Sequence, residues 1–134
     1  MRYQRVESPQ KLDGPEAARD FFSGCFADQD SGRESLWVAH LDEEARCVQL
    51  TRHEGDRTGI EFPLRKIIVD AARNNSAAIL LAHNHPSGDP TPSQSDMRAT
   101  RELATAARAL GCEIADHLVF GSGDCTSLRA LGYL

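Results

Sequence analysis

The sequence predicts an α/β fold in which a mixed β-sheet is flanked by helices. Residues 77–82 are all apolar, as expected of a strand that is covered on both faces. Residues 93–110 place apolar side chains at helical spacing and form the longest expected helix. Because helical and strand-like patterns alternate along the chain, we expect the helices to pack against a single sheet.

The chain has 134 residues, which is enough for one ordinary hydrophobic core and too few for two. Its apolar content of 40% and charged content of 26% are typical of a globular protein rather than a disordered one. We therefore expect a single domain over residues 1–134. It would consist of an N-terminal helical segment at 1–30 and a motif-bearing core at 31–134.

Proline, glycine and asparagine mark the ends of the expected elements. Pro63 suits the first position of a helix, and Gly111 suits the position just after the end of one. The expected elements, in order, are a leading segment at 1–13, a helix at about 15–25, a turn at 31–32, strands of a hairpin at 36–41 and 47–51, a polar loop at 55–59, a helix at 63–74, a buried strand at 77–82, a helix at 93–110, a strand at 114–120 and a short return strand at 125–128.

Charge and composition exclude several classes of protein. The net charge of −5 does not favour nucleic-acid binding, so DNA as a partner is not supported by charge. The first residues lack the apolar run of a signal peptide, and the apolar run at 77–82 is too short to cross a bilayer. The four cysteines have no close spacing and are expected to be reduced thiols. We expect a soluble, cytoplasmic protein without membrane contact; a homodimer formed through an apolar face stays open.

The most informative segment, H-N-H-P-S-G-D-P-T-P-S-Q-S-D, runs from His83 to Asp96. Alternate residues of a strand point to the same side, so His83 and His85 can reach one ion together. Imidazole nitrogens suit zinc, and a catalytic zinc takes three protein ligands and a water molecule. Asp96 is the candidate for the third ligand.

Asp96 also fits a second interpretation, because Ser93-x-x-Asp96 has the spacing of a helix capping box. Asp is less typical than Glu in that role, and Asp96 lies on the inward stripe of its helix, which favours the ligand role. The other histidines, His40, His53 and His117, are expected to be core or surface residues. Asp116 could pair with the adjacent His117 and so help to hold a metal ligand in place.

The segment resembles the JAMM (MPN+) metalloprotease motif, in which an upstream Glu is followed by His-x-His, seven residues, Ser, two residues and Asp. It is most similar to the RadC-like bacterial branch of that superfamily. The resemblance extends from about Glu34 to the C-terminus. It implies a JAB/MPN-like (deaminase-like) domain that holds Zn²⁺ through His83, His85 and Asp96. It also implies two catalytic residues, Glu34 as the general base and Ser93 as a hydrogen-bond donor to the oxyanion.

The activity implied by the resemblance is that of a zinc metallopeptidase or isopeptidase, acting on a protein or peptide substrate that the sequence does not identify. RadC-like proteins commonly carry an N-terminal helix-hairpin-helix module. Residues 1–30 are too few for it, so we expect the catalytic-type domain nearly alone. The choice of zinc over iron or manganese also rests on the resemblance, because two nitrogens and a carboxylate do not decide it.

Two alternatives stay open. One is a metal-dependent nuclease or a RadC-like factor associated with DNA repair, which salt-sensitive retention of DNA would support. His-Asn-His nucleases build their site on a ββα hairpin, whereas this triplet is expected to end a buried strand. The other alternative is a non-catalytic MPN-type scaffold, which the complete ligand set argues against.

Overall fold

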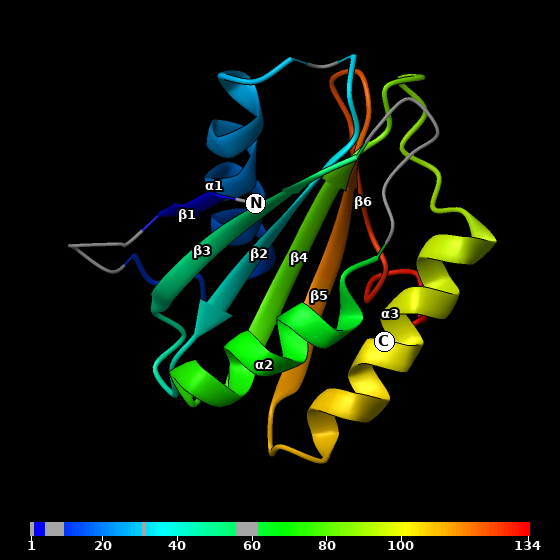
Figure 1. Cartoon of the computed structure of the whole chain (residues 1–134). Helices are drawn as coiled ribbons and strands as arrows, with labels where there is room; N and C mark the ends of the chain where they lie inside the picture. Colours follow the sequence, from blue (N-terminus) through cyan, green and yellow to red (C-terminus); the bar gives the residue numbers. More distant parts are fainter. Residues whose placement is uncertain (1, 5–9, 31, 56–61) are drawn as a thin grey trace.

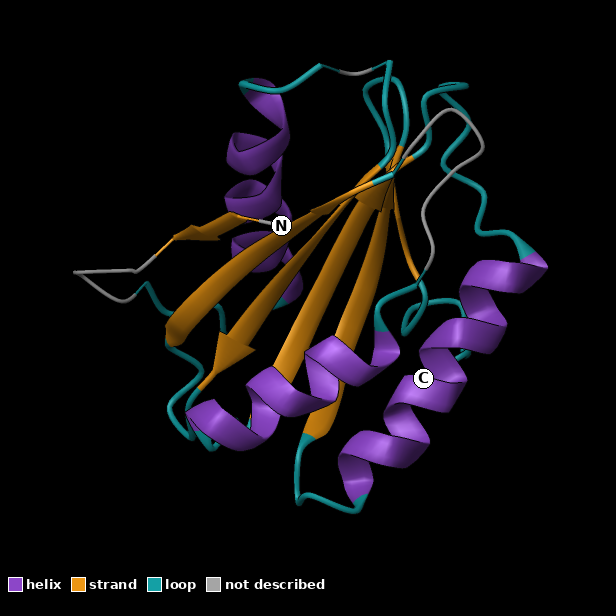
Figure 2. Ribbon diagram, viewed as in Figure 1, coloured by secondary structure: helices purple, strands orange, loops and turns teal. Residues whose placement is uncertain are grey.

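The computed structural model describes residues 2–4, 10–30, 32–55 and 62–134. At its centre is a six-stranded sheet in the order β1-β3-β2-β4-β5-β6. The strands are β1 (Arg2–Gln4), β2 (Ser35–Leu41), β3 (Cys47–Glu54), β4 (Ala78–Asn84), β5 (Glu113–Phe120) and β6 (Cys125–Ser127). Helix α1 (Pro15–Ala27) covers one face of the sheet, and α2 (Leu64–Asn74) and α3 (Gln94–Arg108) cover the other (Figure 1, Figure 2). The predicted α/β fold, a mixed sheet flanked by helices, is confirmed.

Strand β4 lies inside the sheet and is covered on both faces. It pairs antiparallel with β2 and parallel with β5, and α3 forms the crossover between the two parallel strands. Every residue of β4 from Ile79 to Asn84 is buried. Leu80 and Ala82 pack in the apolar layer beneath α1, whereas Ile79 and Leu81 pack in the layer beneath α2 and α3. The apolar run thus forms the doubly covered strand that the sequence predicts.

Several boundaries differ from the predicted ones; β3, for example, continues to Glu54 and β4 to Asn84. The leading segment contains a short strand, β1, which pairs with β3. Pro63 is the N-cap of α2 rather than its first residue. Helix α3 ends at Arg108, two residues before the predicted end, because the backbone N–H of Cys112 turns back to the carbonyl of Ala107 and Gly111 adopts a φ of +70°.

Two predicted features lie wholly or partly outside the described residues: Ser31 of the predicted turn, and most of the polar loop at 55–59. Within the described part of the chain, none of the helices has the length and apolar character needed to cross a membrane.

Candidate metal centre

The end of β4 brings two imidazole rings together. The His83 side chain points to the side of the sheet that α3 covers, where it lines a small hollow of about 70 Å³ with Leu36, Asp96 and Ala99. His85 follows the strand, and its backbone N–H still donates to the carbonyl of Phe120, at 2.8 Å. The Nε2 atoms of His83 and His85 lie 2.9 Å apart. The structure therefore places both histidines of the motif beside one point in space.

Helix α3 supplies the first carboxylate. Asp96 Oδ2 lies 3.3 Å from Nε2 of His83 and 3.1 Å from Nε2 of His85. The same oxygen accepts a hydrogen bond from the backbone N–H of Ser93, and the Ser93 hydroxyl accepts one from the N–H of Asp96. The capping box is therefore present, and Asp96 caps its helix and faces the histidines with a single side chain.

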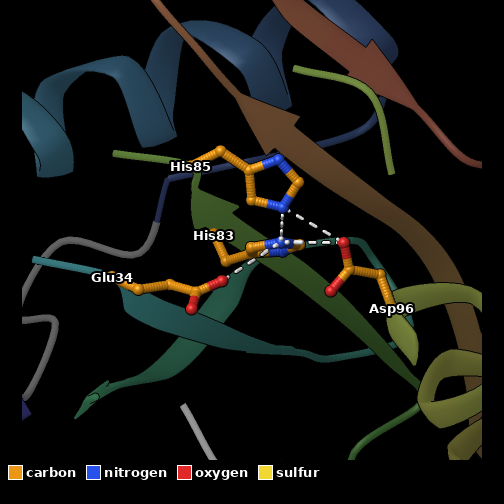
Figure 3. Close-up of side chains that lie close together, drawn as sticks. All are labelled: Glu34, His83, His85 and Asp96. Carbon is orange, nitrogen blue, oxygen red and sulfur yellow. Dashed lines mark hydrogen bonds and ion pairs between the residues drawn. The ribbon is translucent and has the colours of Figure 1, made fainter. Parts of the chain in front are cut away.

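Glu34 supplies the second carboxylate from the segment just before β2. Its Oε1 lies 3.8 Å from Nε2 of His83. The ligand atoms of Glu34, His83, His85 and Asp96 all lie within 4.8 Å of one another, and their side chains converge from three different segments (Figure 3). The four residues expected to hold or act beside a metal are thus brought together in the fold.

The hydrogen bonds of His85 show that this arrangement suits a cation. Its Nδ1 lies 2.9 Å from the carbonyl oxygen of Asp89, and a carbonyl can only accept, so Nδ1 carries the proton of the neutral ring. The lone pair of Nε2 then faces Asp96 Oδ2, which is also an acceptor. Two acceptors at this distance repel each other unless a positive charge lies between them. The donor set of two imidazole nitrogens and carboxylate oxygens fits a zinc ion.

The surroundings hold the carboxylate ionised and a neighbouring ring neutral. Burial raises the pKa of Asp96, but hydrogen bonds and charge from His83 and hydrogen bonds from Ser93 outweigh that effect and hold the pKa below its usual range. Burial lowers the pKa of His117 well below its usual range, and the charge of His83 lowers it further. Asp96 is therefore present as the anion that a metal requires.

Ser93 sits at the N-cap of α3 and is exposed. Because its oxygen accepts from Asp96, its hydroxyl proton is free to point elsewhere. The predicted role of Ser93 as a donor to an oxyanion stays a prediction.

The possible pairing of Asp116 with the imidazole of His117, which the sequence left open, is not the contact that the fold makes. The Asp116 carboxylate instead accepts from the backbone N–H groups of His117 and Arg129 and from the hydroxyl of Ser127. The ring of His117 contacts His83 instead, with Nε2 2.7 Å from Nδ1 of His83. His117 is therefore part of the site, although sequence reasoning treated it as a core or surface residue.

Asn84 also contributes to the site, and the sequence did not predict this. Its carboxamide accepts from the backbone N–H of Ser35 and donates to the carbonyl of Arg33. Glu34 lies between these two attachment points. His40 and His53, by contrast, bond to Ser76 and Thr51 elsewhere in the fold, as the prediction of core residues requires.

Comparison with known proteins agrees with the geometry. Residues 12–133 match the RadC-like JAB domain family. A UPF0758 protein of Chloroflexus aurantiacus is 42% identical over 101 residues, which make up 75% of this chain and 44% of that protein. A UPF0758 protein of Pelobacter propionicus is 33% identical over 132 residues, which make up 98% of this chain and 57% of that protein.

The matched region covers about half of these relatives' own length. The names of both relatives state no activity. Nearly the whole chain lies within the family match, and the motif of that match forms the cluster just described. The chain belongs to the RadC-like JAB domain family.

Proposed function

We propose that this chain is a zinc-dependent hydrolase of the JAMM type that cleaves an amide bond, either a peptide bond or an isopeptide bond to a lysine. The observation that carries the proposal is the convergence of Glu34, His83, His85 and Asp96, with ligand atoms within 4.8 Å of one another. His83, His85 and Asp96 would hold the ion, which matches the three protein ligands of a catalytic zinc site. Bound zinc supplies Lewis acidity, which lowers the pKa of water and polarises a carbonyl group.

We assign the movement of a proton to Glu34. Its carboxylate lies at the edge of the cluster, near His83 but farther from it than Asp96 is. We assign to it the removal of a proton from the attacking water and the delivery of that proton to the departing amine nitrogen. Water and an amide thereby become a carboxylic acid and an amine, which ionise to a carboxylate and an ammonium group, and Glu34 ends as it began.

We assign to Ser93 the stabilisation of the carbonyl oxygen. Its hydroxyl proton is not used by the helix cap and can be donated to the negative charge that develops as the carbonyl is attacked. Removing a single donor of this kind lowers turnover by about 10²–10³-fold in comparable enzymes.

A cleft on the α1 side of the sheet reaches the cluster at His85 and is the candidate path for a substrate. It has a volume of about 460 Å³ and lies between α1, the segment after β4 and the turn between β5 and β6. His85, Phe26 and Phe120 are among the residues that line it, so one wall belongs to the metal centre and another is aromatic. The size falls within the range of small-ligand sites and supports entry of a peptide segment.

The test is elemental analysis of protein purified without a chelator or a histidine tag. We expect about one zinc ion per chain, lost in His85→Ala and kept in His53→Ala, whose ring lies outside the cluster. With zinc bound, Glu34→Gln should retain the ion and lose hydrolysis of amide substrates presented as peptide and isopeptide libraries. If the wild-type protein binds no metal even when zinc is offered, the proposal is wrong and a scaffold becomes the better explanation.

The nuclease alternative gains no support from the fold. His-Asn-His nucleases place their triplet on a ββα hairpin, whereas here the triplet ends β4, an inner strand that is paired on both sides.

A further inference from the structure

A chain of three hydrogen bonds, the first two of them buried, leads from the metal centre into α3. Nδ1 of His83 lies 2.7 Å from Nε2 of His117. Nδ1 of His117 lies 2.6 Å from Oγ1 of Thr100, which lies 2.7 Å from the carbonyl oxygen of Asp96. His83, His117 and Thr100 are each at most 3% exposed, so water does not substitute for any of these contacts.

The donor and acceptor of each hydrogen bond in this chain follow from its last acceptor, the carbonyl oxygen of Asp96. The carbonyl of Asp96 can only accept, so the Thr100 hydroxyl donates to it and has no second proton to give. Oγ1 of Thr100 therefore accepts from Nδ1–H of His117, which leaves Nε2 of His117 as an acceptor. That atom accepts from Nδ1–H of His83, so the neutral form of His83 has the lone pair of its Nε2 facing the cluster.

We propose that Thr100 and His117 are positioning residues that fix the tautomer and orientation of His83, so that its Nε2 is unprotonated where the ion binds. The identity of the ion rests on the proposed function, whereas the tautomers can be observed without any ion. Neither residue is assigned a contact with the metal or the substrate. Both act through hydrogen bonds to a ligand, a form of support that commonly changes metal affinity by about 10–100-fold.

The physical basis is a buried donor that would lose its acceptor. When His83 Nε2 binds an ion, the ring must carry its proton on Nδ1 and donate it to His117. The remaining proton of His117 then lies on Nδ1 and needs Thr100 as its acceptor. Without the hydroxyl, ion binding would leave a buried N–H without a partner, which is unfavourable.

The test compares Thr100→Val, which removes the hydroxyl at nearly constant shape, with Thr100→Ser, which keeps it. The matched control is Thr105→Val. Thr105 lies on the same helix and donates in the same way, to the carbonyl four residues before it, but it is exposed and away from the site. Zinc dissociation constants are measured by competition with a chromophoric chelator, and thermal unfolding confirms that each variant is folded.

We expect Thr100→Val to bind zinc about 10–100-fold more weakly than the wild type. The zinc dissociation constants of Thr100→Ser and Thr105→Val should lie within about threefold of the wild-type value, because both variants keep the hydrogen bonds between His83, His117 and residue 100. Equal zinc affinity in wild type and Thr100→Val would overturn the proposal.

Nitrogen-15 NMR of the histidine side chains in the metal-free protein gives an independent result. We expect a proton on Nδ1 of both His83 and His117 in the wild type, and a shift of the His117 proton toward Nε2 in Thr100→Val. The Nε2–H tautomer in wild-type His117 would contradict the proposed chain of hydrogen bonds, whether or not zinc binds. Failure of the proposed function has a different signature, namely wild-type protein that binds no zinc or that binds it without hydrolysing amides.

Discussion

The carboxamide of Asn84 makes hydrogen bonds to the backbone on both sides of Glu34. Its Oδ1 accepts from the N–H of Ser35 at 2.8 Å, and its Nδ2 donates to the carbonyl of Arg33 at 2.9 Å. The β2–β4 ladder ends one residue earlier, where Leu36 lies opposite His83. The side chain of Asn84 thus continues the pairing beyond the ladder and fixes the backbone that carries the proposed general base.

Replacing Asn84 by Ala should therefore affect both stability and turnover. The N–H of Ser35 would be buried without an acceptor, which costs about 1–3 kcal/mol of unfolding free energy. Zinc content should stay near one ion per chain, because no proposed ligand is removed. Turnover should fall because Glu34 is no longer held in place.

Urea unfolding and steady-state kinetics with saturating zinc measure the two effects. Asn84→Asp provides a comparison, because it keeps the acceptor for Ser35 and loses the donor to Arg33. An Asn84→Ala protein with wild-type stability and wild-type turnover would show that the two hydrogen bonds from Asn84 to the backbone around Glu34 are unimportant.

The two roles of Ser93 can be separated by substitution. Ser93→Ala removes the helix cap and the proposed oxyanion donor, so we expect a loss of about 1 kcal/mol in stability together with a large loss of turnover. Ser93→Asp restores a cap but supplies no proton, and Ser93→Thr supplies both. We therefore expect stability to recover in both variants and turnover to recover in Ser93→Thr alone. Recovery of turnover in Ser93→Asp would exclude the donor role.

His40 should make the stability of the protein depend on pH. Burial lowers the pKa of His40 from 6.5 to about 4, with the charge of Asp70 acting in the opposite direction and that of His53 in the same direction. The folded protein thus holds the ring neutral, whereas the unfolded chain takes up a proton below about pH 6.5. This proton uptake does not affect the unfolding free energy above about pH 6.5. As the pH falls from about 6.5 to 4, it lowers the unfolding free energy by about 3 kcal/mol in total.

The measurement is the unfolding free energy of wild type and His40→Asn across this pH range. Asn keeps a polar group near Ser76, the partner of His40 Nδ1. Because contributions from the metal centre are common to both proteins, the difference between the two curves isolates His40. Parallel curves would contradict the prediction.

Zinc should stabilise the folded protein by binding to it in preference to the unfolded chain. At a free zinc concentration of about 100 times the dissociation constant, the expected gain is about 2.7 kcal/mol. We expect the melting temperature to rise on adding zinc to wild type and to Glu34→Gln, and to stay unchanged in His85→Ala. A chelator should reverse the rise. An equal rise in all three proteins would place the zinc elsewhere.

The sequence predicts the parts of the site that are close together along the chain. His83 and His85 are recognisable because a strand places alternate residues on one side, and Asp96 because it follows at the start of the next helix. Glu34 could be proposed only through the family resemblance, since its position depends on β2 pairing with β4. The pairing of β1 with β3 was missed for a similar reason, because three residues carry too little pattern to mark a strand.

The supporting residues could not be found in this way. His117 reaches His83 because β5 pairs in parallel with β4, and Thr100 reaches His117 because α3 packs over both strands. Neither contact has a local signature: a single histidine in an apolar strand and a single threonine in a helix are ordinary core residues. A prediction that β5 pairs with β4, together with the register of that pairing, would have placed His117 beside the motif.

The alternation of side chains along β4 limits where the chain can accept an insertion or deletion. The His83 side chain points into the cluster, and the next residue, Asn84, points to the opposite face, where it lines the cleft beside α1. A codon inserted between Ala82 and His83 would exchange the two faces and withdraw both residues from their partners at once. Insertions and deletions among natural versions of this domain should therefore avoid the last residues of β4.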